Sequence, residues 1–432
     1  TTKKGAYPFM KILVIGQGGR EHAIIKKLKE SRGVTEIFVL PGNGGMEKDA
    51  KRVPIGVMEI EKAVDFAKSE KIDYVVIAPD DPLVAGAADE FMKAGFPVFG
   101  PDKKAAEIEG SKVFSKNLMK KYNIPTARYE VFSDMEKALS YLDTAPLPTV
   151  IKADGLALGK GVIIANTLPE AKKAVREIMG DKVFGKSGDS IVIEEFLEGP
   201  EVSVLAFTDG NEVKPMVSSM DHKRALDNDE GLNTGGMGTV APNPYYTEKI
   251  ADECMEKIFI PTIRSMKSEG RTFRGCLYFG LMLTKDGPKV IEYNCRFGDP
   301  ETQVVLPLLE SDLFEIMRAV TEGRLSEVDV RFKNESACCV ILASGGYPKS
   351  YEKGFKISFD ESVADKLIFA GAKKGDDGLY TDGGRVLGVV ETAPTLSEAI
   401  GKAYDSVKKV TFKNAFYRSD IGKRALLAKE AE

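Results

Sequence analysis

The chain has 432 residues, of which 43% are hydrophobic and 29% are charged, and its formal net charge is -4 at pH 7. This length predicts roughly three domains, and the composition is typical of a soluble globular protein. The acidic balance excludes a global attraction to nucleic acid or to an anionic membrane, but it is compatible with a local basic pocket for phosphates.

Cysteine and histidine usage narrows the chemistry. Five cysteines without a C-x-x-C pair favour a reducing cytosol over disulfides or structural zinc, and two histidines exclude a three-histidine zinc site. No apolar run is long enough to span a bilayer. Residues 1–9 precede Met10 and are interpreted as a vector-derived remnant or a processed leader. We therefore expect a cytoplasmic protein that uses carboxylates, lysines, arginines and a bound metal.

The first predicted domain, residues 10–110, alternates strands and helices. An apolar strand at 11–15 runs into a glycine turn, and a helix follows as far as Leu28. This alternation predicts a Rossmann-like parallel sheet whose ligand crevice lies at the carboxyl ends of its strands. The residues at those ends, and therefore the candidate ligand contacts, are Gly18, Gly19, Asn43 and Asp80.

A nicotinamide-dependent oxidoreductase is the alternative for this domain. Glu21 stands at the third glycine position of G-x-G-x-x-G, where its carboxylate would repel a pyrophosphate, and the second strand has no acidic residue at its tip for a ribose. These features leave a smaller phosphorylated ligand or a merely structural turn.

The second predicted domain, residues 111–330, contains a lid subdomain at about 126–196. A strand at 149–153 carries Lys152, and a glycine-rich loop with Gly159 and Lys160 follows it. The loop is no P-loop, because three residues separate its glycines where four are required, and Gly161 stands where Ser or Thr should be. Between two antiparallel strands it is either a lid over a triphosphate or an ordinary hairpin.

Two polar connectors follow in this domain. Residues 194–201 could bind an adenine through backbone groups and one apolar side chain, and could bind its ribose through a carboxylate. Alternatively, they form a plain surface hinge. The loop that starts at Asp221, His222 and Lys223 mixes both charges with glycines. It suits a small zwitterion, or it is simply solvated.

The strand predicted at 289–295 closes an Asp-Gly hairpin. Glu292, Asn294 and Arg296 share one face at a spacing of roughly 6 to 7 Å, which suits a metal-bound polyphosphate. The alternative is an idle solvent-facing strand. Asp299 is predicted to cap a helix that starts at Pro300. The third domain, residues 331–432, is expected to be small, mixed α+β and without chemistry of its own.

Six motifs in order carry a family resemblance: IGQGGREHA at 15–23, EGSK at 109–112, KADGLA at 152–157, DHKR at 221–224, NTGGMG at 233–238 and RFGDPE at 296–301. From about Met10 to about Leu426 the chain resembles the phosphoribosylamine-glycine ligase (glycinamide ribonucleotide synthetase) family of the ATP-grasp superfamily. The resemblance implies an α/β protein with an N-terminal Rossmann-like domain, a central ATP-grasp domain with a lid, and a small C-terminal domain.

The resemblance also implies a reaction. Glycine is ligated to 5-phosphoribosylamine with ATP, through glycyl phosphate, giving glycinamide ribonucleotide, ADP and phosphate in de novo purine biosynthesis. It implies ATP and Mg²⁺, with Mn²⁺ as an alternative, and small-molecule partners only. We expect a cytoplasmic monomer without a nucleic-acid or membrane partner.

The resemblance also implies the following site roles. The metal ligands would be Glu292 and Asn294. The triphosphate contacts are Lys112, Lys152, Gly159 and Lys160; the adenine contacts are Glu194, Glu195, Phe196 and Leu197, with Glu201 on the ribose. Asp221, His222, Lys223 and Arg296 surround glycine and the acyl phosphate. Phosphoribosylamine is held by Gly18, Gly19, Asn43 and Asp80, and Asn233 and Asp299 complete the substrate contacts.

The sequence departs from the family pattern in places. Asp80 stands where the family has Glu, so its reach to a ribose hydroxyl is shorter. Residues 281–283 supply no second acidic metal ligand, so the metal is expected to depend on Glu292, Asn294 and phosphate oxygens. The rival readings are an ATP-grasp ligase for formate or bicarbonate and a non-catalytic nucleotide-binding protein.

Overall fold

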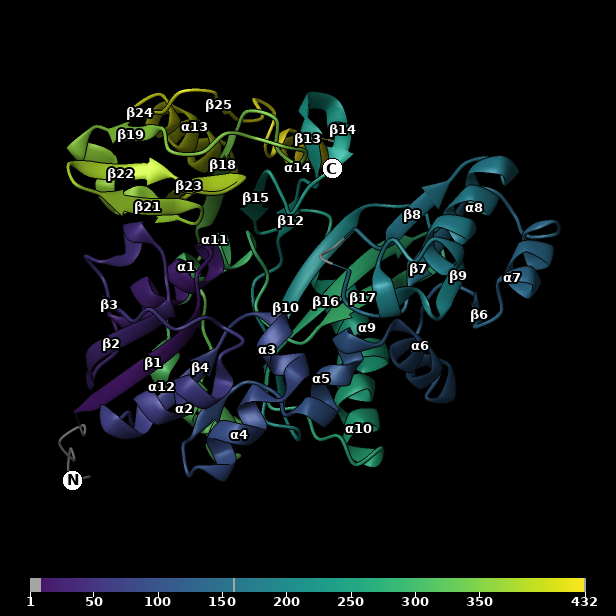
Figure 1. The fold of residues 1–432 in the computed structure, drawn as a ribbon, viewed down its shortest axis with the longest axis horizontal. Helices are drawn as coiled ribbons and strands as arrows, with labels where there is room; N and C mark the ends of the chain where they lie inside the picture. Colours follow the sequence, from purple (N-terminus) through teal and green to yellow (C-terminus); the bar gives the residue numbers. More distant parts are fainter. Residues whose placement is uncertain (1–8, 158–159, 431–432) are drawn as a thin grey trace.

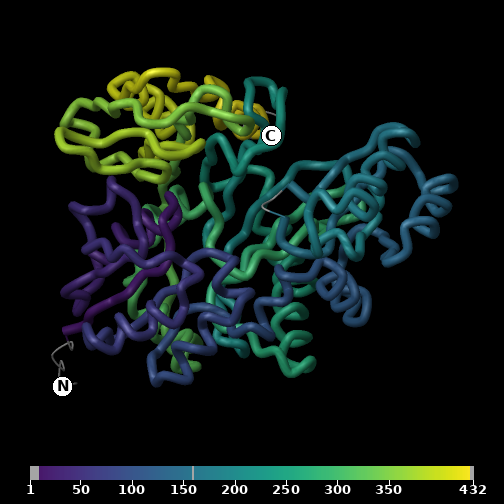
Figure 2. The backbone as a smooth tube through the Cα atoms, in the orientation of Figure 1, coloured from purple at the N-terminus to yellow at the C-terminus, as the bar shows by residue number. Residues whose placement is uncertain are grey.

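The structure is a computed structural model that describes residues 9–157 and 160–430; Gly159 lies outside the described residues. In Figure 1 the N-terminal region lies below the C-terminal region, and a lid projects from the opposite side of the central region. Figure 2 follows the same path as a tube, in which the end of the chain returns to the top of the central region.

The N-terminal region is a parallel sheet, as the alternating pattern predicts. Its order is β3-β2-β1-β4-β5, and the apolar runs of β1 and β4 are buried because helices cover the sheet. The strands are β1 (Met10–Gly16), β2 (Val34–Pro41), β3 (Lys51–Arg52), β4 (Tyr74–Ile77) and β5 (Val98–Phe99). The helices are α1 (Gly19–Leu28), η1 (Gly44–Met46), α2 (Ile60–Ser69), α3 (Asp80–Ala85), α4 (Ala87–Lys93) and α5 (Lys103–Gly110).

The lid is an antiparallel sheet in the order β6-β9-β7-β8, and it has a small hydrophobic core of its own. The predicted antiparallel pairing on either side of the glycine-rich loop is confirmed by β7 and β8. The strands are β6 (Tyr129–Phe132), β7 (Thr149–Ala153), β8 (Val162–Ala165) and β9 (Ile191–Glu195). The helices are α6 (Lys112–Lys121), α7 (Met135–Leu142), α8 (Leu168–Val175), η2 (Arg176–Gly180) and η3 (Gly185–Gly188).

The central sheet has the order β11-β10-β16-β17 and contains the predicted Asp-Gly hairpin. Its strands are β10 (Glu201–Thr208), β11 (Val213–Pro215), β16 (Gly275–Thr284) and β17 (Gly287–Asn294). A helical segment made of α9 (Glu248–Cys254), a π-helical turn η5 (Met255–Phe259) and α10 (Ile260–Ser268) packs with this sheet. One hydrophobic core runs from this sheet into the N-terminal region, so the two regions pack directly together.

The C-terminal region has two sheets, in the orders β12-β15-β18-β23-β20 and β21-β22-β19-β24. Strands β12 (Met220–Asp221) and β15 (Gly238–Ala241) come from the central part of the chain, so this sheet crosses the boundary predicted near residue 330. The remaining strands are β18 (Ser336–Ser344), β19 (Lys356–Phe359), β20 (Leu367–Phe369), β21 (Ala372–Gly375), β22 (Gly378–Thr381), β23 (Arg385–Ala393), β24 (Val410–Thr411) and β25 (Ala415–Phe416). The helices are η7 (Leu325–Glu327), η8 (Glu361–Lys366), α13 (Leu396–Val407) and α14 (Lys423–Glu430).

The helix predicted to start at Pro300 with Asp299 as its cap is wrong in detail. The observed elements are α11 (Thr302–Val305), η6 (Leu306–Leu308) and α12 (Leu313–Glu322), and the residue before α11 is Glu301. Asp299 accepts hydrogen bonds from the backbone of Arg20 and the side chain of Gln303 instead. Contacts with the N-terminal region therefore take the place of a cap.

Within the described ranges, no helix combines the length and the apolar character needed to cross a membrane.

Candidate active site

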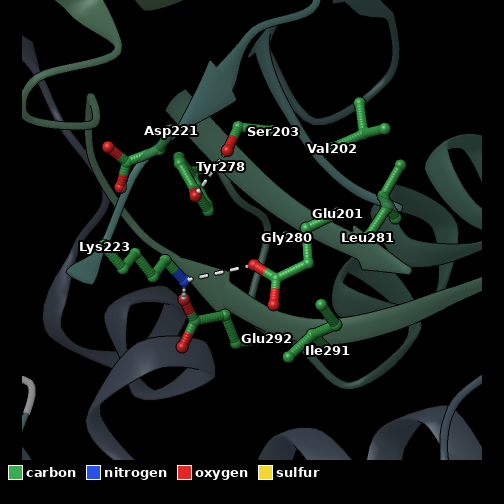
Figure 3. Close-up of a pocket in the computed structure, with 10 residues that line it drawn as sticks. All are labelled: Glu201, Val202, Ser203, Asp221, Lys223, Tyr278, Gly280, Leu281, Ile291 and Glu292. Carbon is green, nitrogen blue, oxygen red and sulfur yellow. Dashed lines mark hydrogen bonds and ion pairs between the residues drawn. The ribbon is translucent and has the colours of Figure 1, made fainter. Parts of the chain in front are cut away.

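The polar face of β17 lies beside a pocket (Figure 3). Arg296 Nη2 donates to Asn294 Oδ1 at 3.3 Å, so these two side chains lie on one side of the chain, as the strand alternation predicts. Glu292 pairs across the hairpin with Gly280, where an added Cβ would lie 3.0 Å from Glu292 Cγ. The glycine therefore leaves room for the carboxylate. The pocket is lined by Glu201, Val202, Ser203, Asp221, Lys223, Tyr278, Gly280, Leu281, Ile291 and Glu292.

One ammonium lies between two carboxylates in this pocket. Lys223 Nζ is 3.8 Å from Glu201 Oε2 and 3.9 Å from Glu292 Oε1, as Figure 3 shows. The two carboxylates come from different strands, β10 and β17. The structure thus brings together residues that the sequence assigns to the ribose, the metal and the acyl phosphate.

Positive charge dominates around Glu292. Burial alone would raise the pKa of Glu292, but the charges of the surrounding cations outweigh burial and lower the pKa. In decreasing order of effect these cations are Lys223, Lys152, Lys112 and Arg296. These four cations gather around one carboxylate, although three of them also pair with Glu201, Glu194 and Glu109. A cluster of cations beside a pocket is the kind of environment that binds phosphate groups.

The lysine cluster, Lys116, Lys152 and Glu194, lies between the lid and the central sheet. Both lysine Nζ atoms are 3.1 Å from oxygens of Glu194, and all three residues are buried. Lys152 Nζ also donates to the carbonyl of Ile291, and Lys116 Nζ donates to Thr126 Oγ1. The Glu194 carboxylate thus holds two lysines between the lid and the central sheet, and its predicted contact with adenine stays a prediction.

The arginine cluster, Arg296 with Glu109, lies at the other end of the polar face. Arg296 Nη2 is 3.2 Å from Glu109 Oε1, and Glu109 Oε2 accepts the backbone N–H of Cys295 at 2.7 Å. Burial alone would lower the pKa of Arg296, but the negative charges of Glu109 and Asp80 outweigh burial and raise the pKa above its usual value. Its Nε is buried and has no hydrogen-bond partner within the described part of the chain. An unpaired N–H at this position is available to an anionic substrate.

Lys112 is held against the glycine-rich loop. Its Nζ donates to the carbonyl of Gly155 at 3.0 Å, and Asp154 Oδ1 accepts from Ser111 Oγ and from the N–H of Val113 at the start of α6. These bonds fix the start of α6 to the loop that follows β7. Lys160 is exposed and its N–H donates to the carbonyl of Ala157.

The connector after β9 separates into an inner and an outer part. The Glu195 side chain points away from Glu194, and its Oε2 accepts hydrogen bonds from Nε and Nη2 of the exposed Arg128. Phe196 is 38% exposed, Leu197 is half-buried, and Glu201 contributes to the pocket. The adenine role of Glu195 and Phe196 stays a prediction.

The charged loop contributes Asp221 and Lys223 to the pocket, but it directs His222 elsewhere. The His222 ring is fully buried, its Nδ1 lies 3.1 Å from the carbonyl of Gly238, and its Nε2 accepts the N–H of Gly422. Burial lowers the pKa of His222 to about 4, so the ring is neutral. With both nitrogens engaged, a direct substrate contact needs a different ring position. Asn233 is exposed at the end of β14.

The N-terminal glycine turn is filled by its own residues. Glu21 Oε2 accepts the N–H of Gly18 at 2.9 Å, and a Cβ at Gly16 would lie 2.2 Å from Glu21 Cγ. The carboxylate therefore lies where a dinucleotide pyrophosphate would need space. Asp299 Oδ2 lies 3.3 Å from the Cβ position of Gly18, and a Cβ at Gly19 would lie 2.6 Å from the side chain of Gln303.

The other two candidate residues of the N-terminal region differ in how many hydrogen bonds their side chains already make. Asn43 is buried and donates both amide hydrogens, to the carbonyls of Gln17 and Phe369, while its Oδ1 accepts the N–H of Gly45. This side chain joins the N-terminal and C-terminal regions, which limits it as a substrate contact. Asp80 is half-buried at the start of α3, and its charge acts on the arginine cluster.

Several site residues were missed by sequence reasoning. Tyr278 and Glu301 are buried and joined by a 3.1 Å hydrogen bond, and Tyr278 also bonds Ser203. Arg385, from the C-terminal region, donates to the carbonyls of Gly235 and Asp299. Glu109 and Glu301 stood inside recognised motifs, which was a usable signal. Lys116 and Arg385 gave none, because their partners are distant in the sequence. The missed residues are Glu109, Lys116, Ser203, Tyr278, Glu301 and Arg385.

The oxygens of Glu292 and Asn294 fit a magnesium ion carried by a polyphosphate. Within residues 9–157 and 160–430, no group of three or more His, Cys, Asp or Glu side chains is arranged to hold a metal. Mg²⁺ is commonly bound through one or two protein oxygens, with water and substrate phosphates completing its shell. Gly280 leaves room beside the Glu292 carboxylate, which is compatible with a magnesium ion bound through few protein oxygens.

Comparison with known proteins supports an ATP-grasp enzyme. Residues 110–302 match the family model described as Phosphoribosylglycinamide synthetase, ATP-grasp (A) domain; residues 10–109 match its N domain and residues 337–424 its C domain. The biotin carboxylase of Campylobacter jejuni superposes with a TM-score of 0.72 at 14% identity, over 95% of this chain and 94% of that chain, which shows the fold alone. The fold and the site thus define an ATP-grasp protein, and that fold implies the use of ATP.

Closer relatives define the family. The chain is 48% identical over 413 residues to a phosphoribosylamine–glycine ligase of Caldanaerobacter subterraneus subsp. tengcongensis, covering 95% of this chain and 99% of that protein. It is 47% identical over 424 residues to the Escherichia coli O157:H7 ligase, covering 96% and 99%. The crystal structure of the Thermotoga maritima ligase superposes with a TM-score of 0.84 at 37% identity, covering 95% and 100%. The chain belongs to the phosphoribosylglycinamide synthetase family, the phosphoribosylamine–glycine ligases.

Proposed function

We propose that this chain catalyses the ATP-dependent ligation of glycine to 5-phosphoribosylamine in de novo purine biosynthesis. The products are glycinamide ribonucleotide, ADP and phosphate. The observation that carries the proposal is Glu292, in a chain of this family. The charges of Lys223, Lys152, Lys112 and Arg296 act on its carboxylate, and it lines one pocket with Asp221 and Lys223. That arrangement suits a polyphosphate next to a small zwitterion.

The nucleotide is assigned to the space between the lid and the central sheet. Lys112, Lys152 and Lys160 are assigned to its phosphates; the predicted phosphate contact of Gly159 lies outside the described residues. The adenine is assigned to the backbone of residues 194–197, since the carboxylates of Glu194 and Glu195 already pair with cations, and Glu201 is assigned to a ribose hydroxyl. In support, Lys152 already bridges the lid and β17 through the carbonyl of Ile291.

Glu292 and Asn294 are assigned as ligands of Mg²⁺, with Mn²⁺ as an alternative. The metal would neutralise charge on the transferring phosphoryl group. The protein's own part is to hold these two oxygens on one strand face, beside cations that position the phosphates.

Glycine is assigned to the space next to Asp221, Lys223 and Arg296. Burial and the nearby charge of Glu301 raise the pKa of Asp221, while Lys223 opposes the rise. An ammonium group next to these two carboxylates relieves their repulsion. Lys223 and Arg296 then face the glycine carboxylate and its phosphorylated form, and Asn233 lies at the end of the same loop.

The chemistry needs no protein nucleophile. A glycine carboxylate oxygen attacks the γ-phosphorus and the bond to the ADP oxygen breaks, giving glycyl phosphate. The amine of phosphoribosylamine then attacks the carbonyl carbon, phosphate leaves with the bridging oxygen, and the amine nitrogen loses a proton. The protein contributes position and positive charge at both steps.

Phosphoribosylamine is assigned to the N-terminal crevice, at Gly18, Gly19 and Asp80, next to Asp299. The contacts of Asp299 with the backbone of Arg20 support an approach of this crevice to the arginine cluster. Asn43 and His222 are assigned to holding this geometry, because their polar atoms already bond other regions. The domain division at residues 10–110, 111–330 and 331–432 belongs to the same proposal, as do a cytoplasmic location and a monomeric state.

The direct test is ADP release with magnesium, glycine and freshly made phosphoribosylamine, with mass spectrometry of the product. We expect ADP and glycinamide ribonucleotide in equal amounts, and neither without glycine. Formate and bicarbonate serve as matched replacements for glycine. ADP release that is independent of glycine, or a product containing formate or bicarbonate, would contradict the proposal.

A further inference from the structure

The hairpin that follows Lys223 has little support of its own. It consists of β13 (Arg224–Leu226), a short turn η4 (Asp227–Asp229) and β14 (Glu230–Asn233). All of β14 is exposed, and Leu226 and Leu232 are 51% and 48% exposed. The buried side chain of these two strands is the small Ala225, and an isolated two-stranded hairpin is marginally stable by itself. Its conformation therefore depends on contacts made outside it.

The tip of the hairpin has an unfavourable backbone. Asn228 has φ 60° and Asp229 has φ 56°, so two consecutive residues that are not glycine adopt the left-handed conformation. Such residues persist where the surroundings hold them. The neighbouring contacts should therefore come from a rigid part of the molecule.

Those contacts come from residues 418–424, which we name the C-terminal clamp. Figure 1 shows the end of the chain beside β13 and β14. Arg418 is only 2% exposed and its Nε and Nη2 donate to the two oxygens of Asp420 at 2.8 and 2.9 Å. Its Nη1 donates to Asp229 Oδ1 at 3.0 Å and to the carbonyl of Arg224 at 3.1 Å. One buried guanidinium thus joins the clamp to the start and the tip of the hairpin.

Two further bonds complete the contact with the tip. The N–H of Ser419 donates to Asp227 Oδ1 at 2.8 Å, and the N–H of Asn228 donates to Asp420 Oδ2 at 2.9 Å. The hydroxyl of Ser419 bonds the other oxygen of Asp227. Every residue of the tip turn is therefore bonded to the clamp.

The clamp also reaches the residues that line the pocket. The N–H of Gly422 donates to His222 Nε2 at 3.1 Å, and Arg424 Nη2 donates to the carbonyl of Asp221 at 3.4 Å. On the other side of the hairpin, the carbonyl of Lys223 accepts from the N–H and the hydroxyl of Thr234, at 2.7 and 2.8 Å. Lys223 therefore lies between two points that the clamp holds, namely His222 and the hairpin.

We propose that the C-terminal clamp positions Asp221 and Lys223 for glycine, and that Arg418 is the positioning residue at its centre. The inference rests on the proposed function. The Lys223 side chain is 44% exposed, and its ion pairs within residues 9–157 and 160–430 are long, at 3.8 and 3.9 Å, so its location is set mainly by its backbone. Loosening the hairpin should move this ammonium and Asp221 while leaving the lysine cluster in place.

The test compares Arg418→Ala and Arg418→Lys with the unchanged enzyme. We expect Arg418→Ala to raise the KM for glycine by at least about tenfold, because small misplacements of binding groups have large effects, and to change the KM for ATP by less than about twofold. The KM for glycine of Arg418→Lys should lie between those of Arg418→Ala and the unchanged enzyme, since one ammonium cannot replace a bidentate guanidinium. Lys356→Ala is the matched control, because it removes an exposed ion pair of the same region with Asp377 that is remote from the hairpin.

Hydrogen exchange provides a readout that is independent of turnover. In Arg418→Ala the amides of residues 224–233 should exchange faster, while those of β7 and β9 keep their protection. Faster exchange with an unchanged KM for glycine would overturn the proposal, as would equal rises in the KM for glycine and for ATP.

A milder variant covers the case in which Arg418→Ala does not fold. Asp227→Ala removes the two bonds that Ser419 donates at the tip and leaves the bonds of Arg418 in place, and it should raise the KM for glycine by a few-fold. An unchanged KM in this variant would overturn the proposal. If the unchanged enzyme shows no glycine-dependent turnover, the proposed function fails, and hydrogen exchange then still decides whether the clamp orders the hairpin.

Discussion

The lysine cluster and the arginine cluster lie at the two ends of the same polar strand face, but the pKa values of Lys116 and Arg296 shift in opposite directions. Burial lowers the pKa of Lys116 to about 8, although Glu194 opposes the change. In the arginine cluster, Glu109 and Asp80 outweigh burial and raise the pKa of Arg296. The lysine cluster, which we assign to the nucleotide, thus carries a charge that can be lost near physiological pH. The arginine cluster, which we assign to the acyl phosphate, carries one that is permanent.

The largest expected effect comes from removing the carboxylate between the clusters. Glu292→Ala should lower kcat by about 10³-fold or more, because metal and phosphoryl charge lose their main protein ligand. The fold should survive, since the residue is half-buried and no core cavity is created. ADP release together with a thermal melt measures both effects. Undiminished turnover in a folded variant would remove the metal assignment.

The arginine cluster is broken by Arg296→Ala. We expect kcat to fall by about 10² to 10³-fold, the usual loss for a group that stabilises charge in the transition state. Glu109→Gln should cost less, about tenfold, because Arg296 keeps its charge and loses only the partner that orients it. Steady-state kinetics with saturating ATP separates the two variants. A larger loss for Glu109→Gln than for Arg296→Ala would contradict this order.

The lysine cluster should make ATP binding depend on pH. The KM for ATP should rise above about pH 8 as Lys116 loses its proton, since that is where its pKa lies. Glu194 raises this pKa, so Glu194→Gln should move the rise to lower pH. Lys116→Met is the control and should show no such rise between pH 7 and 9.

The same pKa has a consequence for stability. The folded-state pKa of about 8 lies below the usual lysine value near 10.5, so between these values the unfolded chain binds more protons. The contribution of Lys116 to the free energy of unfolding should therefore increase as pH rises through this window. Urea denaturation of Lys116→Met against the unchanged protein, at pH 7 and pH 9.5, measures it. A contribution that falls with pH would contradict the assignment.

The smallest effect is expected outside both clusters. Arg128→Ala removes the exposed ion pair of Glu195, the neighbour of Glu194 on β9. The free energy of unfolding should change little, because an exposed ion pair contributes little to stability, and kcat should not change. Denaturant unfolding and ADP release check this expectation. A loss of kcat comparable to that of Arg296→Ala would place Glu195 inside the reaction site.

The sequence predicts those features that depend on local periodicity. Glu292 and Asn294 are two residues apart on a strand, so their shared face follows from the alternation of side chains, and the hairpin follows from its Asp-Gly turn. Glu21 could be recognised as incompatible with a pyrophosphate for a similarly local reason.

Features that depend on distant partners could not be predicted. Asn43 and His222 are residue types that suit a site, but their side chains bond residues 326 and 200 positions away. The same holds for Arg385, whose guanidinium reaches the carbonyls of Gly235 and Asp299 across the sheet shared with β12 and β15. Nothing in the local sequence around Arg385 specifies these contacts.

The central claim is that glycine is activated by phosphorylation beside Glu292 and Arg296, and oxygen isotopes test it most directly. Glycine labelled with ¹⁸O in both carboxylate oxygens is converted with unlabelled ATP and phosphoribosylamine, and the phosphate and the product are examined by mass spectrometry. We expect one ¹⁸O atom in each phosphate and one in the amide carbonyl of each product. Phosphate without ¹⁸O would contradict it.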